Sequence, residues 1–83
     1  MKITVKYFAG IREAIGQAQE PLETVAPTLA ALRDELIARG GAYAEALSRG
    51  KAVRAALGQV MSDEQVALHD GAEVAFFPPV TGG

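Results

Sequence analysis

The residues with the clearest chemical meaning stand at the end of the sequence, in the run Phe-Phe-Pro-Pro-Val-Thr-Gly-Gly at residues 76–83. Six residues follow the expected last strand, and six extended residues reach roughly 20 Å. Two prolines favour a stiff polyproline conformation at the base, whereas Gly82 and Gly83 have no β-carbon to block entry into a narrow site. We interpret residues 78–83 as a tail that delivers the α-carboxylate of Gly83 to a partner, in preference to a frayed terminus.

The sequence contains few of the residues and motifs that enzymes use for catalysis. The sequence contains no Gly-x-Ser-x-Gly elbow, no Walker phosphate loop and no Gly-x-Gly-x-x-Gly motif. The lack of cysteine excludes a disulfide scaffold, a thiolate zinc site, a persulfide carrier and a cysteine nucleophile. The single histidine, His69, stands beside a turn-forming Asp-Gly pair and is interpreted as structural. We therefore expect no metal site, no bound cofactor and no enzyme activity of the chain alone.

Carboxylates that are close in sequence are also expected to be structural. These pairs are Asp34 with Glu35, Asp63 with Glu64, and Asp70 with Glu73. Each lies on an expected polar helix face or in a turn, where such side chains are usually solvated. General acid or base catalysis by them is not expected.

Composition predicts one small domain without a nucleic-acid partner. The chain has 83 residues and a formal net charge of −2, which lacks the basic excess of nucleic-acid-binding proteins. No apolar run approaches the roughly 20 residues of a membrane span, and the N-terminal residues alternate instead of forming a signal-peptide block. We expect a cytoplasmic protein with no membrane partner.

Apolar periodicity predicts the strands of an α+β domain. Residues 2–8 alternate between apolar Ile3, Val5 and Tyr7 and polar neighbours, as a half-buried strand does. A second strand, antiparallel to the first, is expected near residues 22–25. A last strand at residues 73–77 must end at the prolines that follow.

One main helix is expected between these strands. Thr28 is its predicted N-cap, leucines recur at positions 29, 32 and 36, Arg39 lies in the last turn and Gly40-Gly41 ends it. Shorter helices are expected at residues 11–15 and 42–47. Residues 51–61 fit two patterns, because their alanines favour a helix whereas their alternation and Gly58 favour strand and turn.

Two aromatic side chains are expected to face outward on the sheet. Phe8 follows the lysine side of the first strand, and Phe77 is out of phase with its inward-facing neighbours. Together with Met61 they resemble the hot spot of a protein interface. The alternative is that one or both aromatic side chains fold back into the core. Lys2 and Lys6 either protect this strand against edge pairing or attract an acidic partner.

These residues together resemble the small, sulfur-carrying subunit of molybdopterin synthase, a family of the ubiquitin-like β-grasp group. The likeness spans the whole chain and rests above all on residues 76–83, with support from Phe8-Ala9, Arg12-Glu13, the helix leucines and Asp70-Gly71. Gly58, where the family often has Asn, and Ala72, where Asp is common, depart from its pattern. The implied fold is a mixed sheet of four or five strands packed on one main helix, with a β-grasp domain at residues 1–77 and the tail at 78–83.

The resemblance also implies a mechanism. An activating enzyme would adenylate Gly83 with ATP, and a sulfur donor protein would convert the acyl-adenylate to a thiocarboxylate. The tail, comprising Pro78, Pro79, Val80, Thr81 and the terminal glycines, would then enter the large catalytic subunit of a heterotetramer of two small and two large subunits. There the sulfur would pass to cyclic pyranopterin monophosphate to form the dithiolene of molybdopterin.

Other functions share parts of this pattern. A sulfur carrier for thiamine or amino-acid biosynthesis, or a ubiquitin-like protein modifier, would have the same diglycine. A binding module with an unmodified tail is an alternative from a different class. An enzyme that uses its own carboxylates is the poorest alternative, because no nucleophile, base and electrophile converge in the sequence.

Overall fold

The computed structural model describes residues 1–79, so the predicted tail residues Val80, Thr81, Gly82 and Gly83 lie outside the described residues. Five strands and three helices are found in residues 1–79. In chain order they are β1 (Lys2–Tyr7), α1 (Ala9–Ile15), β2 (Gln19–Glu23), α2 (Leu29–Ile37), α3 (Gly41–Leu47), β3 (Arg54–Leu57), β4 (Val60–Met61) and β5 (Glu73–Phe77).

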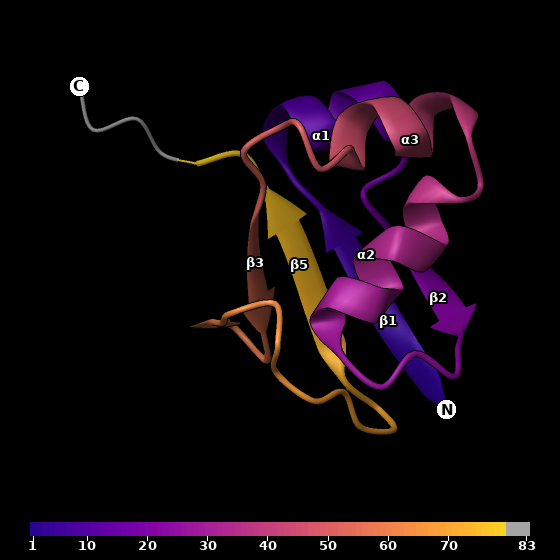
Figure 1. The fold of residues 1–83 in the computed structure, drawn as a ribbon, viewed down its shortest axis with the longest axis vertical. Helices are drawn as coiled ribbons and strands as arrows, with labels where there is room; N and C mark the ends of the chain where they lie inside the picture. The colour runs from indigo at the N-terminus through magenta and orange to yellow at the C-terminus, as the bar shows by residue number, and fades with distance from the viewer. Residues whose placement is uncertain (80–83) are drawn as a thin grey trace.

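The strands form one mixed sheet in the order β2-β1-β5-β3-β4. β1 and β5 are parallel, and the other neighbours are antiparallel. Figure 1 shows α2 crossing one face of the sheet, with α1 and α3 at the end toward which β1 and β5 point. The architecture is the predicted α+β arrangement of a mixed sheet and one main helix.

The core lies between α2 and one face of the sheet. Ile3, Val5 and Tyr7 point into it from β1, as the alternation predicts, and Val74 and Phe76 join them from β5. The helix leucines at positions 29, 32 and 36 are fully buried against these side chains. The opposite sheet face therefore carries the other set of alternating side chains.

The second strand differs from its predicted position. β2 begins at Gln19, three residues before the predicted range, and Val25 is 92% exposed beyond its end. Pro21 therefore lies inside the strand, opposite Thr4. This is possible because β2 is at the edge of the sheet, where a residue without an N–H can face solvent.

The main helix begins as predicted but ends early. The Thr28 hydroxyl accepts a hydrogen bond from the Ala31 N–H at 3.2 Å, which confirms the N-cap. The helix ends at Ile37, so Arg39 is beyond the last turn and binds Glu20 of β2 instead. Arg39 thus forms an ion pair with Glu20 of another element, in place of the predicted interaction with the C-terminal end of its own helix.

Residues 54–61 form a hairpin, which decides between the two patterns in this segment. The two central turn residues, Gly58 and Gln59, have φ of 58° and 70°. Positive φ at both positions is typical of a two-residue type I′ turn, for which Gly and Asn are the favoured residues. Glycine suits position 58, because it has no β-carbon to oppose a positive φ.

Candidate functional site

The sheet face opposite α2 carries a shallow apolar groove. A hollow of about 470 Å³ is lined by Phe8, Phe77 and Ala75, together with Lys6, Gln59 and Glu73. Phe8 is 45% exposed and Phe77 is half-buried. The structure thus brings together the two aromatic residues that were predicted to face outward.

Backbone geometry holds the two aromatic residues beside each other. The Phe8 N–H donates to the Phe76 carbonyl at 3.1 Å, which extends the β1–β5 pairing by one residue. Ala9 then has φ of 50°, an uncommon value for a residue with a β-carbon, and the chain turns there into α1. Phe8 consequently stays on the outer face while Ile11 enters the core.

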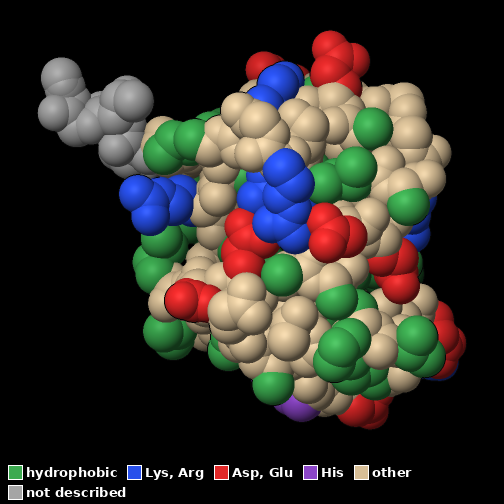
Figure 2. Space-filling model, in the orientation of Figure 1, with side chains coloured by type: hydrophobic (Ala, Val, Ile, Leu, Met, Phe, Trp, Pro, Cys, Tyr) green, Lys and Arg blue, Asp and Glu red, His purple; other side chains and the backbone are tan. Residues whose placement is uncertain are grey.

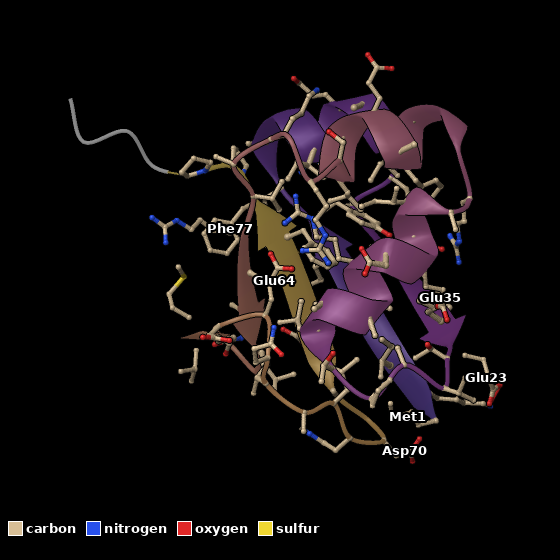
Figure 3. All side chains as sticks on the ribbon, in the orientation of Figure 1. Met1, Glu23, Glu35, Glu64, Asp70 and Phe77 are labelled. Carbon is tan, nitrogen blue, oxygen red and sulfur yellow. The ribbon has the colours of Figure 1, made fainter. Side chains whose placement is uncertain are left out.

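Phe77 is also the last strand residue before the predicted tail. Figure 3 shows it where β5 ends, beside β3, and its cross-strand neighbour is Arg54. The next residues, Pro78 and Pro79, are half-buried, and Pro78 lines a hollow of about 250 Å³ between α1 and residues 51–53. β5 therefore ends immediately beside the apolar groove, which Phe77 lines.

Met61 lies on the same face but outside the groove. Strand register aligns Lys6, Ala75, Ala56 and Met61 in one row across four strands. Met61 is 58% exposed and lines a separate hollow of about 820 Å³ on the β4 side. The predicted set of three is therefore a pair at the groove and a third side chain at the edge of the face.

The two lysines of β1 have different surroundings. Lys6 forms an ion pair with Glu73 at 3.3 Å, which neutralises its charge within the groove. The Lys2 side chain is exposed at the far end of the strand, next to the turn whose Asp70 accepts the Lys2 N–H at 2.7 Å. His69 is exposed at the same turn.

A buried arginine that the sequence analysis missed anchors the segment before β3. Arg33 is 4% exposed, and its guanidinium donates to the carbonyls of Leu47, Ser48 and Lys51 and to Glu64 at 2.7 Å. It occupies the i+4 position of the stripe that begins at Leu29, which was the available signal for burial. Arg33 thereby holds α3 and residues 48–51 against α2.

The carboxylates of this region are paired with other side chains; Asp34 is 64% exposed, in line with the expected solvation, whereas Glu35 and Glu64 are only partly exposed. Figure 3 shows Glu64 beside α2, where it binds both Arg33 and Arg49. Asp34 pairs with Arg49 at 2.9 Å, and Glu35 accepts the Thr24 hydroxyl. Figure 2 shows Lys/Arg atoms in blue directly beside Asp/Glu atoms in red near the centre of the molecular face on which α2 lies. They act as cross-links between elements, and none faces the groove.

A second missed cluster centres on Glu20. Its carboxylate accepts hydrogen bonds from Tyr7 at 2.8 Å and Tyr43 at 2.7 Å, and it pairs with Arg39 at 3.1 Å. Burial alone would raise the pKa of Glu20, but the bonds from Tyr43, Tyr7 and Arg39 outweigh burial and hold that pKa below its usual value. Burial and the bond to Glu20 raise the pKa of Tyr7, so the phenol stays a donor.

Glu20→Gln is expected to reduce stability most at neutral pH. Because the folded pKa is lowered, the ionised carboxylate stabilises the fold above its unfolded pKa, and this contribution is lost as pH falls through the folded value. The variant should lose about 1–2 kcal/mol near pH 7, and its difference from wild type should narrow in acid. Urea unfolding from about pH 7 to pH 3.5 measures this. Glu45→Gln, at an exposed α3 position, is the matched control, and an equal pH effect there would contradict the assignment.

The described residues contain neither a membrane-spanning helix nor a cluster of metal-binding side chains. None of the helices in residues 1–79 is long and apolar enough to cross a membrane. Within the same range, no group of three or more His, Asp or Glu side chains is arranged to hold a metal ion.

Comparison with known proteins identifies the family. The model of the ThiS family matches residues 5–83 of the chain. The chain belongs to the ThiS family. A curated relative, the molybdopterin synthase sulfur carrier subunit of Escherichia coli K12, is 43% identical over 81 residues, covering 98% of this chain and 99% of that protein. The resemblance stated from the sequence is confirmed.

Solved structures with the same fold agree with the assignment of the chain to the ThiS family. Subunit 1 of molybdopterin-converting factor from Helicobacter pylori, solved in complex with subunit 2, is 25% identical, with full coverage of both chains and a TM-score of 0.70. Small archaeal modifier protein 1 of Haloferax volcanii has a TM-score of 0.76 at 21% identity, covering 95% of this chain and 98% of that one. The latter likeness concerns the fold alone, which is the predicted ubiquitin-like β-grasp.

Proposed function

We propose that this protein is the sulfur-carrier subunit of molybdopterin synthase. The observation that carries the proposal is the match to a curated sulfur-carrier subunit over nearly its entire length, combined with a diglycine tail that begins at an exposed apolar groove. The carrying atom is the carbonyl carbon of Gly83, which suits a chain that contains no cysteine.

The chemistry begins with an unreactive terminus. An α-carboxyl group has a reference pKa of roughly 3.3–3.7, so Gly83 is an anion at neutral pH and a poor electrophile. In the proposed reaction a carboxylate oxygen attacks the α-phosphate of ATP on an activating enzyme, and pyrophosphate leaves. Sulfide-level sulfur released by a donor protein then attacks the carbonyl carbon of Gly83, the bond from that carbon to the AMP oxygen breaks, and AMP leaves the thiocarboxylate behind.

Transfer requires a second docking event. The loaded tail enters the large catalytic subunit, and its sulfur bonds to cyclic pyranopterin monophosphate. A water molecule then attacks the carbonyl carbon of Gly83, the carbon–sulfur bond breaks, and Gly83 returns to a carboxylate. Two sulfurs are needed for each dithiolene, so two loaded carriers are consumed. The Helicobacter pylori relative, whose subunit 1 forms a complex with subunit 2, supports a large-subunit partner for this chain.

The structure supplies the features that such a carrier needs. Phe8, Phe77 and Met61 present apolar surface on a sheet face that no helix of residues 1–79 covers, and aromatic residues of this kind dominate binding energy at protein interfaces. The tail follows directly after Phe77, through Pro78 and Pro79, so a partner docked on Phe77 is held next to the start of the tail. Residues 78–83, with Val80 and Thr81 among them, are proposed to contact the partner's channel.

The decisive experiment measures the intact mass of the protein after incubation with a cognate activating enzyme, ATP and a sulfur donor. Replacement of one oxygen by one sulfur is expected, followed by its loss when the large subunit and pterin substrate are added. An unchanged mass with an active enzyme would favour an unmodified binding module. Isopeptide-linked products on other proteins would instead indicate a modifier, a class to which the fold neighbour from Haloferax volcanii belongs by name.

Phe77→Ala is expected to weaken binding to both the activating enzyme and the large subunit by about 30-fold, because truncation of a central aromatic costs about 2 kcal/mol. The fold should persist, since Phe77 lies outside the buried core cluster. Titration calorimetry with each partner measures the affinities. Val25→Ala, which shortens an exposed apolar side chain outside the groove, is the control. Unchanged affinity of Phe77→Ala for both partners would refute this role.

A further inference from the structure

The outer sheet face has a cation whose charge is not used within the described fold. Arg54, the first residue of β3, is exposed and lies directly across from Phe77. The ion pairs within residues 1–79 involve Lys6, Arg33, Arg39 and Arg49, and none includes Arg54. The one acidic residue that lines the adjacent groove, Glu73, is already paired with Lys6.

The position of Arg54 ties it to the tail. The chain leaves β5 at Phe77, so a partner that takes up the residues after Phe77 must approach the start of β3. Figure 2 shows Lys/Arg side-chain atoms projecting at this edge of the molecule, next to the end of the described chain. Docking over the groove consequently brings partner atoms against the guanidinium.

Docking of a partner over an unpaired guanidinium costs free energy. Covering a guanidinium with apolar surface removes its hydration, and this cost is offset only if the partner provides hydrogen-bonding acceptors of opposite charge. A carboxylate matches the planar fork of arginine with two parallel hydrogen bonds. The chain as a whole has a net charge of −2, so attraction of an acidic surface has to be local.

We infer that Arg54 is a specificity-determining residue that pairs with a carboxylate on the large catalytic subunit next to Phe77, where Arg54 lines the hollow of about 820 Å³ beside the Phe8–Phe77 groove. This inference rests on the proposed function, because it takes the large subunit as the protein docked on this face. The apolar groove supplies most of the affinity, while Arg54 speeds association and selects a partner surface that is acidic at the point where the tail enters.

The test compares charge-matched variants in binding to the large subunit. Arg54→Gln is expected to lower the association rate about two- to fivefold, the range for one exposed ion pair, and the difference should shrink in about 0.5 M salt. Arg54→Lys should retain the association rate but dissociate faster, because it keeps the charge and loses the fork. Lys2→Gln removes the same charge from the far end of the sheet and should leave both rates near wild type.

Each outcome has a separate meaning. Equal association rates for Arg54→Gln and Lys2→Gln would overturn the inference. A fall in the association rate of Arg54→Gln that does not depend on salt would also overturn it, as would a fall seen only with the activating enzyme. Failure of the wild-type protein to bind the large subunit would instead refute the proposed function, and the inference with it. Thermal unfolding of each variant checks that the fold is retained, which the exposure of both side chains predicts.

Discussion

Deletion of Gly83 is expected to abolish thiocarboxylate formation while leaving the melting temperature unchanged. The shortened chain still ends in a carboxylate, but that group is retracted by about 3.5 Å from the reacting position. Misplacement of a reacting group by about 1 Å costs roughly 100-fold in rate, so the loss should exceed this factor. Intact mass after incubation with the activating enzyme, ATP and sulfur donor measures the effect.

A matched control extends the chain by one glycine after Gly83. This variant moves the carboxylate by the same distance in the opposite direction and keeps the diglycine intact. Both variants should fail if the position of the carboxylate is what the activating enzyme reads. Normal loading of the shortened chain would show that Gly83 is not the required acceptor. A marked fall in its melting temperature would show that the tail stabilises the fold, although the buried core cluster of the described residues ends at Phe76.

Arg33→Met is expected to be the most destabilising single substitution of a polar side chain in this fold. It removes the hydrogen bonds to the carbonyls of Leu47, Ser48 and Lys51 and leaves Glu64 without its buried partner. Breaking a buried ion pair on one side costs about 3–5 kcal/mol, and the lower value applies because Glu64 retains Arg49. In a domain of this size the melting temperature should fall by about 15 °C, as calorimetry will measure.

Arg49→Met is the control for this prediction. Arg49 binds Glu64 and Asp34 in the same network, but its side chain is 46% exposed, so its removal should cost no more than about 1 kcal/mol. Equal destabilisation by the two substitutions would show that burial is not the source of the effect. Arg33→Met should also weaken partner binding, since Arg33 holds the segment that precedes Arg54 and borders Pro78.

The sequence by itself determined the first and last strands, the start of the main helix, the outward aromatic residues and the family. These features follow from local rules that need no knowledge of distant residues. Alternation with a period of two placed Ile3, Val5 and Tyr7 in the core, and the Thr28 hydroxyl caps its own helix. The run at residues 76–83 carried the resemblance that the comparison with curated relatives confirmed.

Only the tertiary structure decided where the charged side chains lie. Arg33 is buried because carbonyls 14 to 18 residues away and a carboxylate 31 residues away converge on it. Glu20 likewise depends on Arg39 and Tyr43, and Arg54 becomes the neighbour of Phe77 only when β3 pairs with β5. A charged group is stable where its hydrogen-bonding partners are, and a periodic pattern along one segment contains no information about partners that the fold brings from elsewhere.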